Sequence, residues 1–415
     1  MSHALSAAAA AIADILSRHV TASGPIGLAV SGGGDSMALL SAAAELAGHH
    51  DFRVVTIDHG LRAEAREEAA LVAERAAQLA MPHQVVAIDD LEAGPGLQAR
   101  AREARYAALS GWSHDHGLAA TLLGHTRDDV AETFLMRIGR GAGTEGLAAP
   151  QERILRGDAV FLRPFLDLSR AELRDFLRAE GQEWAEDPSN DDASFARVRM
   201  RRLLDLLDAE GLARNDFAAA ARHLRETRAA MREASAELAE RIVTFQGGDA
   251  VVDPTGLNAV ARDRQRMLLT LLIGWIGRGE YAPRGHEQDR LLDWVTVDGP
   301  DRVTLGGCVL DRRAGALRLS REAARMPERG DPEAIYDGRW LFGGEISTGC
   351  HIAPVGEAGL AVLEGWRQGG QPRHAAIAAP ALWQRDTLIA APSLSPRTGV
   401  TLRIVADFPS FCLTH

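Results

Sequence analysis

The chain has 415 residues, of which 46% are apolar and 25% are charged, so it is long enough for two or three domains and can bury a core. No apolar run reaches the roughly 20 residues that span a bilayer, and the N-terminus lacks the features of a secretory signal, which predicts a cytoplasmic protein with no membrane partner. The net charge of −11 argues against a non-specific nucleic-acid binder but is compatible with a local basic face on an acidic body.

Strands and helices are predicted to alternate over the first 140 residues. Apolar runs predict strands at 26–30, 53–57, 84–88 and 119–123, and helices are predicted at 1–20, 37–46, 63–79, 97–110 and 127–139. This alternation is typical of βαβ units and predicts an α/β fold with a doubly wound, Rossmann-like parallel sheet. Its ligand should lie beyond the carboxyl ends of the strands.

The next segment has a weaker pattern. Residues 140–165 lack a regular period and contain several glycines, which predicts a mobile loop. A helix is predicted from Ser169, because Ser169 and Glu172 have the spacing of a capping box. Residues 194–208 are also predicted to be helical.

From Asn215 onwards an apolar residue recurs every seven positions, which predicts one long amphipathic helix packed against others such as 264–277. The recurring residues are Phe217, Leu224, Met231, Leu238 and Phe245.

Beyond about residue 300 the chain has short β-like runs, at 302–305, 316–319, 387–390 and 400–404. We therefore predict three parts: the α/β domain over 1–210, a helical region over 211–290, and a small α+β domain over 291–415.

The glycine-rich turn after the first predicted strand is the first candidate binding site. Glycines between a strand and a helix let backbone N–H groups converge on an anion, and the helix N-terminus adds partial positive charge. Serine hydroxyls can donate to phosphate oxygens. A purely structural corner is the alternative, but the strand–turn–helix context favours a phosphate cradle. The turn comprises Ser31, Gly32, Gly33, Gly34, Asp35 and Ser36.

Residues 124–133 form the second candidate site. On a helix, His125, Asp128, Asp129 and Glu132 are related by steps of three or four residues and share a face. Three carboxylates repel one another unless cations lie among them, such as Mg²⁺ or a substrate ammonium. The alternative is an acidic first turn favoured by the helix dipole, which explains Asp128 and Asp129 but not Glu132 beside His125.

Arginines gather in three groups. Arginine makes bidentate contacts with phosphate. A solvated helix face explains any one group, whereas three groups near one site favour contact with a polyphosphate or RNA. The groups are Arg100, Arg102 and Arg105; Arg137 and Arg140; and Arg197, Arg199, Arg201 and Arg202.

The residue inventory excludes several chemistries. The chain contains no lysine, which excludes a Schiff base, a pyridoxal phosphate anchor and a Walker A lysine. The cysteines, Cys308, Cys350 and Cys412, form no CxxC pair. This argues against a cysteine-ligated zinc or iron–sulfur site and against a disulfide framework.

Six motifs, in order, resemble those of one known family. The turn at 31–36 is similar to the PP-loop (SGGxDS) of the N-type ATP pyrophosphatases. The full set resembles the tRNA(Ile)-lysidine synthetase family, strongly over about residues 20–205 and more weakly beyond. The other motifs lie at 57–62, 124–133, 137–143, 163–166 and 186–190.

The resemblance implies a PP-loop ATPase fold and a ligase that uses ATP and Mg²⁺. Members of the family attach L-lysine to C2 of the wobble cytidine in the CAU anticodon of tRNA(Ile). An adenylated cytidine is the intermediate, and pyrophosphate and then AMP are released. The product, lysidine, pairs with A instead of G, so the tRNA reads AUA instead of AUG. A homodimer is compatible with the sequence but not required by it.

The resemblance also implies roles for individual residues. Asp35 would help to hold Mg²⁺–pyrophosphate. Asp129 and Glu132 would bind the ammonium groups of lysine, and one of them would accept a proton. Arg105, with Arg140, would neutralise charge on the transferring phosphoryl group. The catalytic residues expected are therefore Asp35, Asp129, Glu132 and Arg105.

Two further sets are implied. ATP would be bound by residues 31–36 together with Asp58, His59, Gly124 and His125. The tRNA contacts expected are Arg102, Arg137, Arg140, Arg197, Arg199 and Arg201, with further contacts from the two parts beyond residue 210.

Three other readings compete with this one. A tRNA 2-thiocytidine enzyme shares the PP-loop but needs paired cysteines, which the chain lacks. A glutamine-dependent amidotransferase would have a glutaminase domain before the loop. A nucleotide-binding scaffold without catalysis is disfavoured because Asp35, Asp129 and Glu132 are all present.

Overall fold

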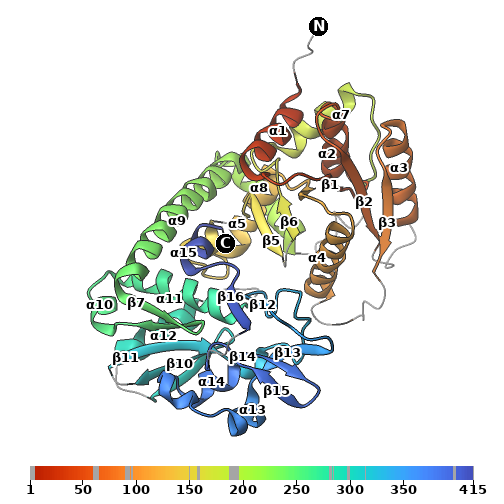
Figure 1. Cartoon of the computed structure of the whole chain (residues 1–415). Coiled ribbons are helices and arrows are strands. Elements are labelled where there is room, and N and C mark those ends of the chain that lie inside the picture. Colours follow the sequence, from red (N-terminus) through yellow and green to blue (C-terminus); the bar gives the residue numbers. More distant parts are fainter. Residues whose placement is uncertain are drawn as a thin grey trace. The chain divides into compact units, whose positions relative to one another are not determined.

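The structure is a computed structural model that divides into two compact units, Met1–Glu226 and Thr227–His415 (Figure 1). It describes residues 5–58, 65–88, 94, 97–148, 150–156, 159–186, 196–279, 283, 285–296, 300–313, 315–395 and 399–414.

A sheet of six strands forms the centre of the first unit in the described residues, in the order β3-β2-β1-β4-β6-β5. Neighbouring strands are parallel except for β5, which is antiparallel to β6 at the edge. The strand order reverses direction at β1 and β4, and such a switch point is where α/β sheets bind ligands. The strands are β1 (Ile26–Ala29), β2 (Phe52–Asp58), β3 (His83–Ala87), β4 (Ala120–Leu123), β5 (Arg153–Arg156) and β6 (Ala159–Leu162).

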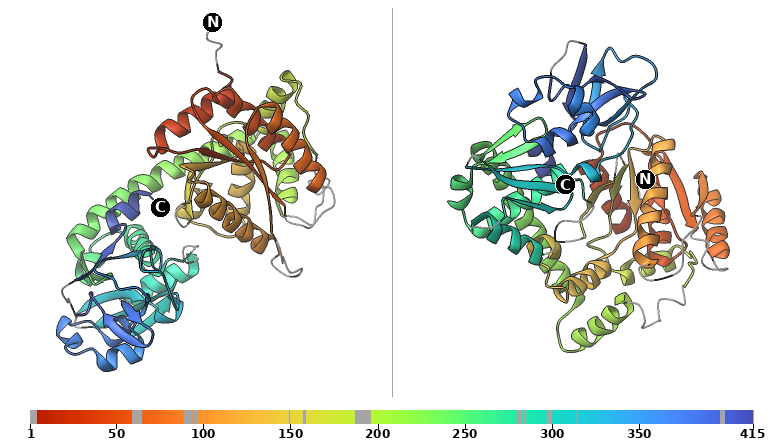
Figure 2. Two further views of the ribbon diagram at one scale, coloured as in Figure 1. Left: turned by 45° about the vertical axis from the view of Figure 1, so that its right-hand side comes forward. Right: turned by 90° about the horizontal axis from the view of Figure 1, so that it is seen from below.

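Helices cover both faces of this sheet (Figures 1 and 2). On one face α2 packs between α1 and α7, and α3 adds apolar side chains to the same core. On the other face α4 contributes Tyr106, Leu109 and Trp112. Each fully buried leucine, such as Leu39 in α2, stabilises this core by about 2 kcal/mol. The helices are α1 (Ala7–His19), α2 (Gly34–Ala44), α3 (Ala65–Gln78), α4 (Leu97–Asp115), α5 (Arg127–Ile138), α6 (Thr144–Leu147), α7 (Arg170–Ala179) and α8 (Ala196–Ala209).

The predicted alternation of strands and helices over the first 140 residues, and the doubly wound α/β fold, are confirmed. The predicted loop at 140–165 is wrong, because it contains α6 and the β5–β6 hairpin. Its strands are only four residues long, and β5 carries an arginine at each end. Such short segments at a sheet edge leave no readable period.

The long helix predicted from residue 215 is α9 (Arg214–Ile242), and the boundary between the two units falls within it. The helix ends before Phe245, the last position of the heptad pattern, because the chain turns into β7 there and pairs with β8. The seven-residue spacing of Phe245 is therefore coincidental.

The second unit is built around a five-stranded antiparallel sheet in the described residues, in the order β7-β8-β11-β10-β9. Helices α11 and α12 pack on it with the C-terminal α15 and form its apolar core (Figure 2). Two smaller sheets, β12-β16 and β13-β14-β15, follow. The strands are β7 (Val243–Gln246), β8 (Asp249–Val252), β9 (Arg302–Leu305), β10 (Cys308–Arg313), β11 (Ala316–Arg321), β12 (Trp340–Gly344), β13 (Cys350–Pro354), β14 (Pro380–Gln384), β15 (Thr387–Ala390) and β16 (Val400–Ile404).

This organisation differs from the three parts predicted from the sequence. The boundary lies at Glu226, and β7 and β8 fall within the region 211–290 that was predicted to be helical. They belong with the later strands because β8 pairs with β11. No described helix is both long and apolar enough to cross a membrane. The helices after α9 are α10 (Pro254–Asn258), α11 (Arg262–Gly277), α12 (Gly285–Thr296), α13 (Gly356–Val362), α14 (Arg373–Ala378) and α15 (Phe408–Thr414).

Candidate active site

The glycine-rich turn closes on itself between β1 and α2. The Ser36 hydroxyl accepts a hydrogen bond from the Ser31 backbone N–H at 3.1 Å and donates to the Gly33 carbonyl at 2.9 Å. Gly32 has a φ of +90°, and a Cβ there would lie 3.1 Å from the Cβ of Glu68. Within the described part of the chain, a Cβ on Gly33 would approach only the Ser31 hydroxyl, at 4.0 Å. The turn is therefore held rigidly, with an open side at Gly33 where α2 begins.

The second motif lies directly beside this turn. A Cβ on Gly124, after the end of β4, would lie 2.9 Å from the carbonyl oxygen of Asp35 and 3.3 Å from the Cα of Ser36. Real side chains do not approach backbone atoms this closely, so only glycine fits. The close approach places the start of α5 next to the first turn of α2.

The two carboxylate oxygens of Asp129 have different partners, one in the helix cap and one in the site. Thr126 is the N-cap of α5, and its side chain accepts a hydrogen bond from the Asp129 backbone N–H. In return Asp129 Oδ2 accepts from the Thr126 backbone N–H at 2.8 Å. This capping box fixes the carboxylate and leaves Oδ1 directed to other partners.

A single guanidinium joins the three predicted site carboxylates. Arg170 is the first residue of α7, after the Ser169 cap. Its Nε donates to Asp35 Oδ2 at 3.1 Å, its Nη2 to Asp129 Oδ1 at 2.7 Å and its Nη1 to Glu132 Oε1 at 2.7 Å. The sequence reasoning missed this residue. The helix dipole disfavours a cation in the first turn of a helix. The position of Arg170 in the first turn of α7 was therefore the sequence feature that could have indicated a functional role.

The arginine sets the charge state of its partners. Burial raises the pKa of Asp35 to about 6, although the Arg170 charge acts in the opposite direction. Burial also raises the pKa of Asp129, but the Arg170 guanidinium, the other neighbouring positive groups and the backbone hydrogen bond from Thr126 together outweigh it, and the pKa is lowered to about 2. The pKa of Arg170 is itself raised by these carboxylates against the effect of burial. Asp129 is therefore ionised at neutral pH.

Two further arginines reach the same carboxylates from α8. Arg201 Nε donates to Glu132 Oε1 at 2.8 Å, and Arg197 Nη1 lies 3.9 Å from Asp129 Oδ1. Both were predicted as tRNA contacts, and the structure places them at the acidic cluster. Glu132 is fully buried, and its Oε2 has no hydrogen-bond partner among the described residues. This oxygen is an acceptor that a ligand donor can satisfy.

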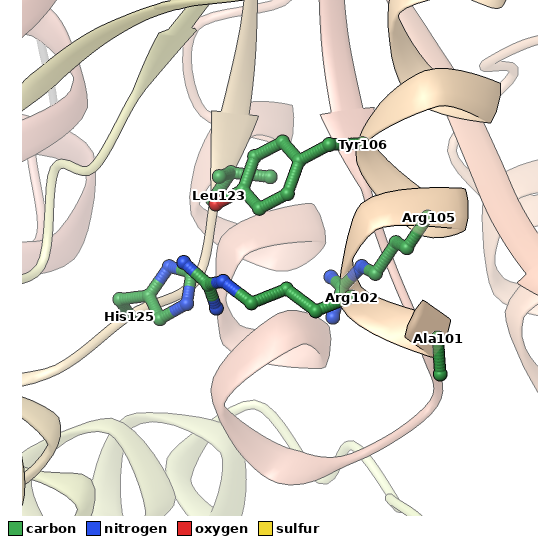
Figure 3. A pocket seen from close by; sticks show the side chains of 6 residues that line it. All are labelled: Ala101, Arg102, Arg105, Tyr106, Leu123 and His125. Carbon is green, nitrogen blue, oxygen red and sulfur yellow. The ribbon is translucent and has the colours of Figure 1, made fainter. Parts of the chain in front are cut away.

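A pocket of about 170 Å³ opens beside the cluster, between α4 and the end of β4 (Figure 3). The Arg102 guanidinium lies 5.1 Å from the centre of the Tyr106 ring. Burial lowers the pKa of Arg105, yet an arginine remains cationic at neutral pH. The pocket therefore suits an anionic ligand. Its lining residues are Ala101, Arg102, Arg105, Tyr106, Leu123 and His125.

The remaining predicted residues are spread more widely. Arg137 donates to the Gly146 carbonyl, whereas Arg140 and Arg199 are exposed. Asp58 is the last residue of β2. His59 lies outside the described residues, as do 60–62 and 187–190 of the predicted motifs.

The chain is similar in sequence to proteins of one family. A family model described as the PP-loop domain matches residues 5–207. The chain is 38% identical over 396 residues to the tRNA(Ile)-lysidine synthase of Ruegeria pomeroyi (strain ATCC 700808 / DSM 15171 / DSS-3), with 94% of each chain covered. It is 39% identical over 312 residues to that of Methylobacterium sp. (strain 4-46), covering 73% of this chain and 90% of the relative.

Among solved structures, the chain is similar to the U34-tRNA thiolase NcsA from Methanococcus maripaludis. The TM-score is 0.44 and the identity 14%, over 53% of this chain and 78% of that one. The match to a curated relative over nearly its whole length, at 38% identity, confirms the resemblance seen in the motifs. The chain belongs to the tRNA(Ile)-lysidine synthase family.

Proposed function

We propose that this chain joins free L-lysine to C2 of the wobble cytidine in tRNA(Ile) with a CAU anticodon. In the first half-reaction the cytidine O2 attacks the α-phosphorus of ATP, and pyrophosphate leaves. In the second, the lysine ε-amine attacks C2, the C–O bond breaks and AMP leaves. The amine loses a proton in this step, so the protein must supply an acceptor. Because tRNA, ATP and lysine are cytoplasmic solutes, we assign the reaction to the cytoplasm.

The observation that carries the proposal is the Oε2 of the buried Glu132, which lacks a partner among the residues described and lies beside the ionised Asp129. A buried carboxylate oxygen without a donor costs free energy, which a bound ammonium group recovers. This pair therefore supports selection of a cationic amine. The hydrogen bonds that link it to Asp35 through Arg170 support an amine site next to the nucleotide turn.

The residues of the turn supply the nucleotide half of the site. Backbone N–H groups at the start of α2, with the open side at Gly33, would hold the phosphates. Among the described residues no three His, Cys, Asp or Glu side chains gather as a metal site. Mg²⁺ bound together with phosphates needs only one or two carboxylates, and Asp35 fits that role. The ion would neutralise phosphate charge when bound.

The remaining arginines support the other parts of the substrate complex. Arg105 lines the pocket and would neutralise charge on the transferring phosphoryl group. Arg102, Arg137, Arg140 and Arg199 would contact tRNA phosphates. The cytidine would leave its stack to reach the site, as enzymes acting on a loop base require.

The decisive experiment measures transfer of labelled lysine to tRNA. Purified protein is incubated with ATP, Mg²⁺, radiolabelled lysine and CAU-anticodon tRNA(Ile), with a methionine tRNA as control. We expect label in the isoleucine tRNA alone, and none with the Asp35→Ala variant. Formation of AMP without label in tRNA would exclude the assignment of lysine to Asp129 and Glu132.

A further inference from the structure

Arg163 is a buried arginine to which neither the nucleotide turn nor the acidic cluster gives a role. It follows β6 and is 4% exposed. Its Nη1 donates to the Gln151 carbonyl at 2.7 Å, and its Nη2 donates to the Tyr106 hydroxyl at 3.1 Å. Its Nε donates to Nδ1 of His125 at 3.1 Å. Each of the three guanidinium nitrogens therefore donates a hydrogen bond within the first unit.

The last of these bonds fixes the tautomer of His125. A guanidinium has N–H donors and no acceptor, so Nδ1 of the histidine must present its lone pair. A neutral imidazole with a lone pair on Nδ1 carries its proton on Nε2. A second proton on Nδ1 would point an N–H at the N–H of Arg163, so the imidazolium form is incompatible with this contact.

The charges around the ring act in the same direction. Arg163, Arg105 and Arg197 are cations that disfavour a charged imidazole, and Asp129 is the carboxylate that favours it. Burial and the Arg163 charge together hold the pKa of His125 well below its usual range.

We propose that Arg163 is a positioning residue that locks His125 as a neutral Nε2–H donor, and that this N–H binds a phosphate oxygen of ATP in the adjoining pocket. The inference rests on the proposed function only for the identity of the ligand. Arg102 and Arg105 line the same pocket, and Arg102 extends toward His125 (Figure 3). Such a site favours an anion, and a neutral donor adds a hydrogen bond without adding another positive charge beside Arg163.

This tautomer of His125 also means that the histidine is not the group that accepts the proton from the attacking amine. A histidine acting as general base toward the pocket needs its lone pair on Nε2, whereas here the lone pair lies on Nδ1 against Arg163. His125 is therefore not the base, and we assign the proton released by the attacking amine to a carboxylate of the acidic cluster.

The first test reads the tautomer directly in the unmodified full-length protein. Histidine is labelled with ¹⁵N, and the His125 resonances are identified by their loss in His125→Gln. We expect an unprotonated Nδ1 and a protonated Nε2, unchanged from about pH 5.5 to about pH 8.5. A proton on Nδ1, or titration near the ordinary histidine pKa, would overturn the proposal.

Variants of the two arginines around Tyr106 extend this test. In Arg163→Met we expect His125 to titrate in the ordinary range, because the donor and its charge are gone. Arg156→Ala is the matched control: the Arg156 guanidinium lies 5.4 Å from the centre of the Tyr106 ring, and we expect its loss to leave the His125 resonances unchanged. If Arg163→Met does not fold, the wild-type spectrum still decides the tautomer.

The second test asks what the N–H binds. The side-chain amide of glutamine can place an N–H where Nε2 lies, whereas that of asparagine reaches only the position of Nδ1. ATP affinity is measured by calorimetry without tRNA. We expect His125→Asn to weaken ATP binding about tenfold and His125→Gln to weaken it much less. Equal losses in both variants, or no loss in either, would overturn the assignment of this N–H to ATP.

These readouts separate the inference from the proposed function. Normal ATP affinity in both variants, combined with slow tRNA-dependent adenylation, would assign the N–H to the tRNA base and overturn the ATP assignment. Absence of lysine transfer by the wild type would overturn the proposed function while leaving the tautomer measurement valid.

Discussion

Arg170 and Arg201 donate to the same oxygen of Glu132, at 2.7 and 2.8 Å, and its second oxygen has no partner in the residues that the structure describes. The two arginines lie on α7 and α8, and Glu132 lies on α5. Two cations on one carboxylate oxygen hold a buried charge in place, and we propose that a substrate donor satisfies the other oxygen.

Replacing Arg170 is expected to destabilise the first unit. Arg170→Ala leaves Asp35, Asp129 and Glu132 without their shared cation, and breaking a buried ion pair costs about 3 kcal/mol. Thermal unfolding followed by circular dichroism should show a clearly lowered Tm. Arg178→Ala is the matched control, because Arg178 lies on the same helix and pairs with the exposed Asp175. Equal Tm values for the two variants would contradict the role of Arg170.

Glu132→Gln should separate the two half-reactions. The amide cannot offer a charged acceptor to an ammonium group, so lysine transfer should fall by about 10- to 100-fold through a higher KM for lysine. Exchange of labelled pyrophosphate into ATP in the presence of tRNA should persist, since it needs no lysine. A parallel loss of both activities would show that Glu132 serves the nucleotide half.

Two glycine substitutions should separate stability of the fold from ATP binding. Gly124→Ala places a Cβ against the Asp35 and Ser36 backbone and should destabilise the fold by about 2 kcal/mol. Gly33→Ala meets no atom of the described residues closer than 4.0 Å and should leave the Tm unchanged while weakening ATP binding about tenfold. Unfolding scans and calorimetry with ATP check both. Wild-type affinity in Gly33→Ala would show that phosphate does not approach that side of the turn.

The second unit should have a stability that depends on pH through Asp249. Burial raises the pKa of this carboxyl to about 7, even with Arg318 at 2.8 Å. A raised pKa means that the folded state binds the proton more tightly, so this stabilisation is present below about pH 4 and is lost as the pH rises through 7.

Relative to Asp249→Asn, the wild type should therefore lose about 2 kcal/mol between about pH 5 and about pH 8. Comparing the two proteins cancels the titration of other groups. A constant difference in Tm across this range would mean that Arg318 keeps Asp249 ionised throughout.

Much of the first unit was predictable from local pattern. The buried strands β1 and β4 are short apolar runs, and the Ser169–Glu172 capping box marks the start of α7. The β5–β6 hairpin and the β7–β8 pair were not predictable, because their stability comes from pairing with strands distant in sequence.

The sequence by itself determined the chemistry and the family: the glycine-rich turn, the acidic cluster and their order require only the identity and spacing of residues. The tertiary structure alone decided which charges meet. Arg170 is 135 residues from Asp35 in the chain, and Arg163 is 38 residues from His125, yet each donates to its partner at 3.1 Å. No local period encodes such contacts, because they arise only when parallel strands bring their carboxyl ends, and the helices that follow, to one edge of the sheet.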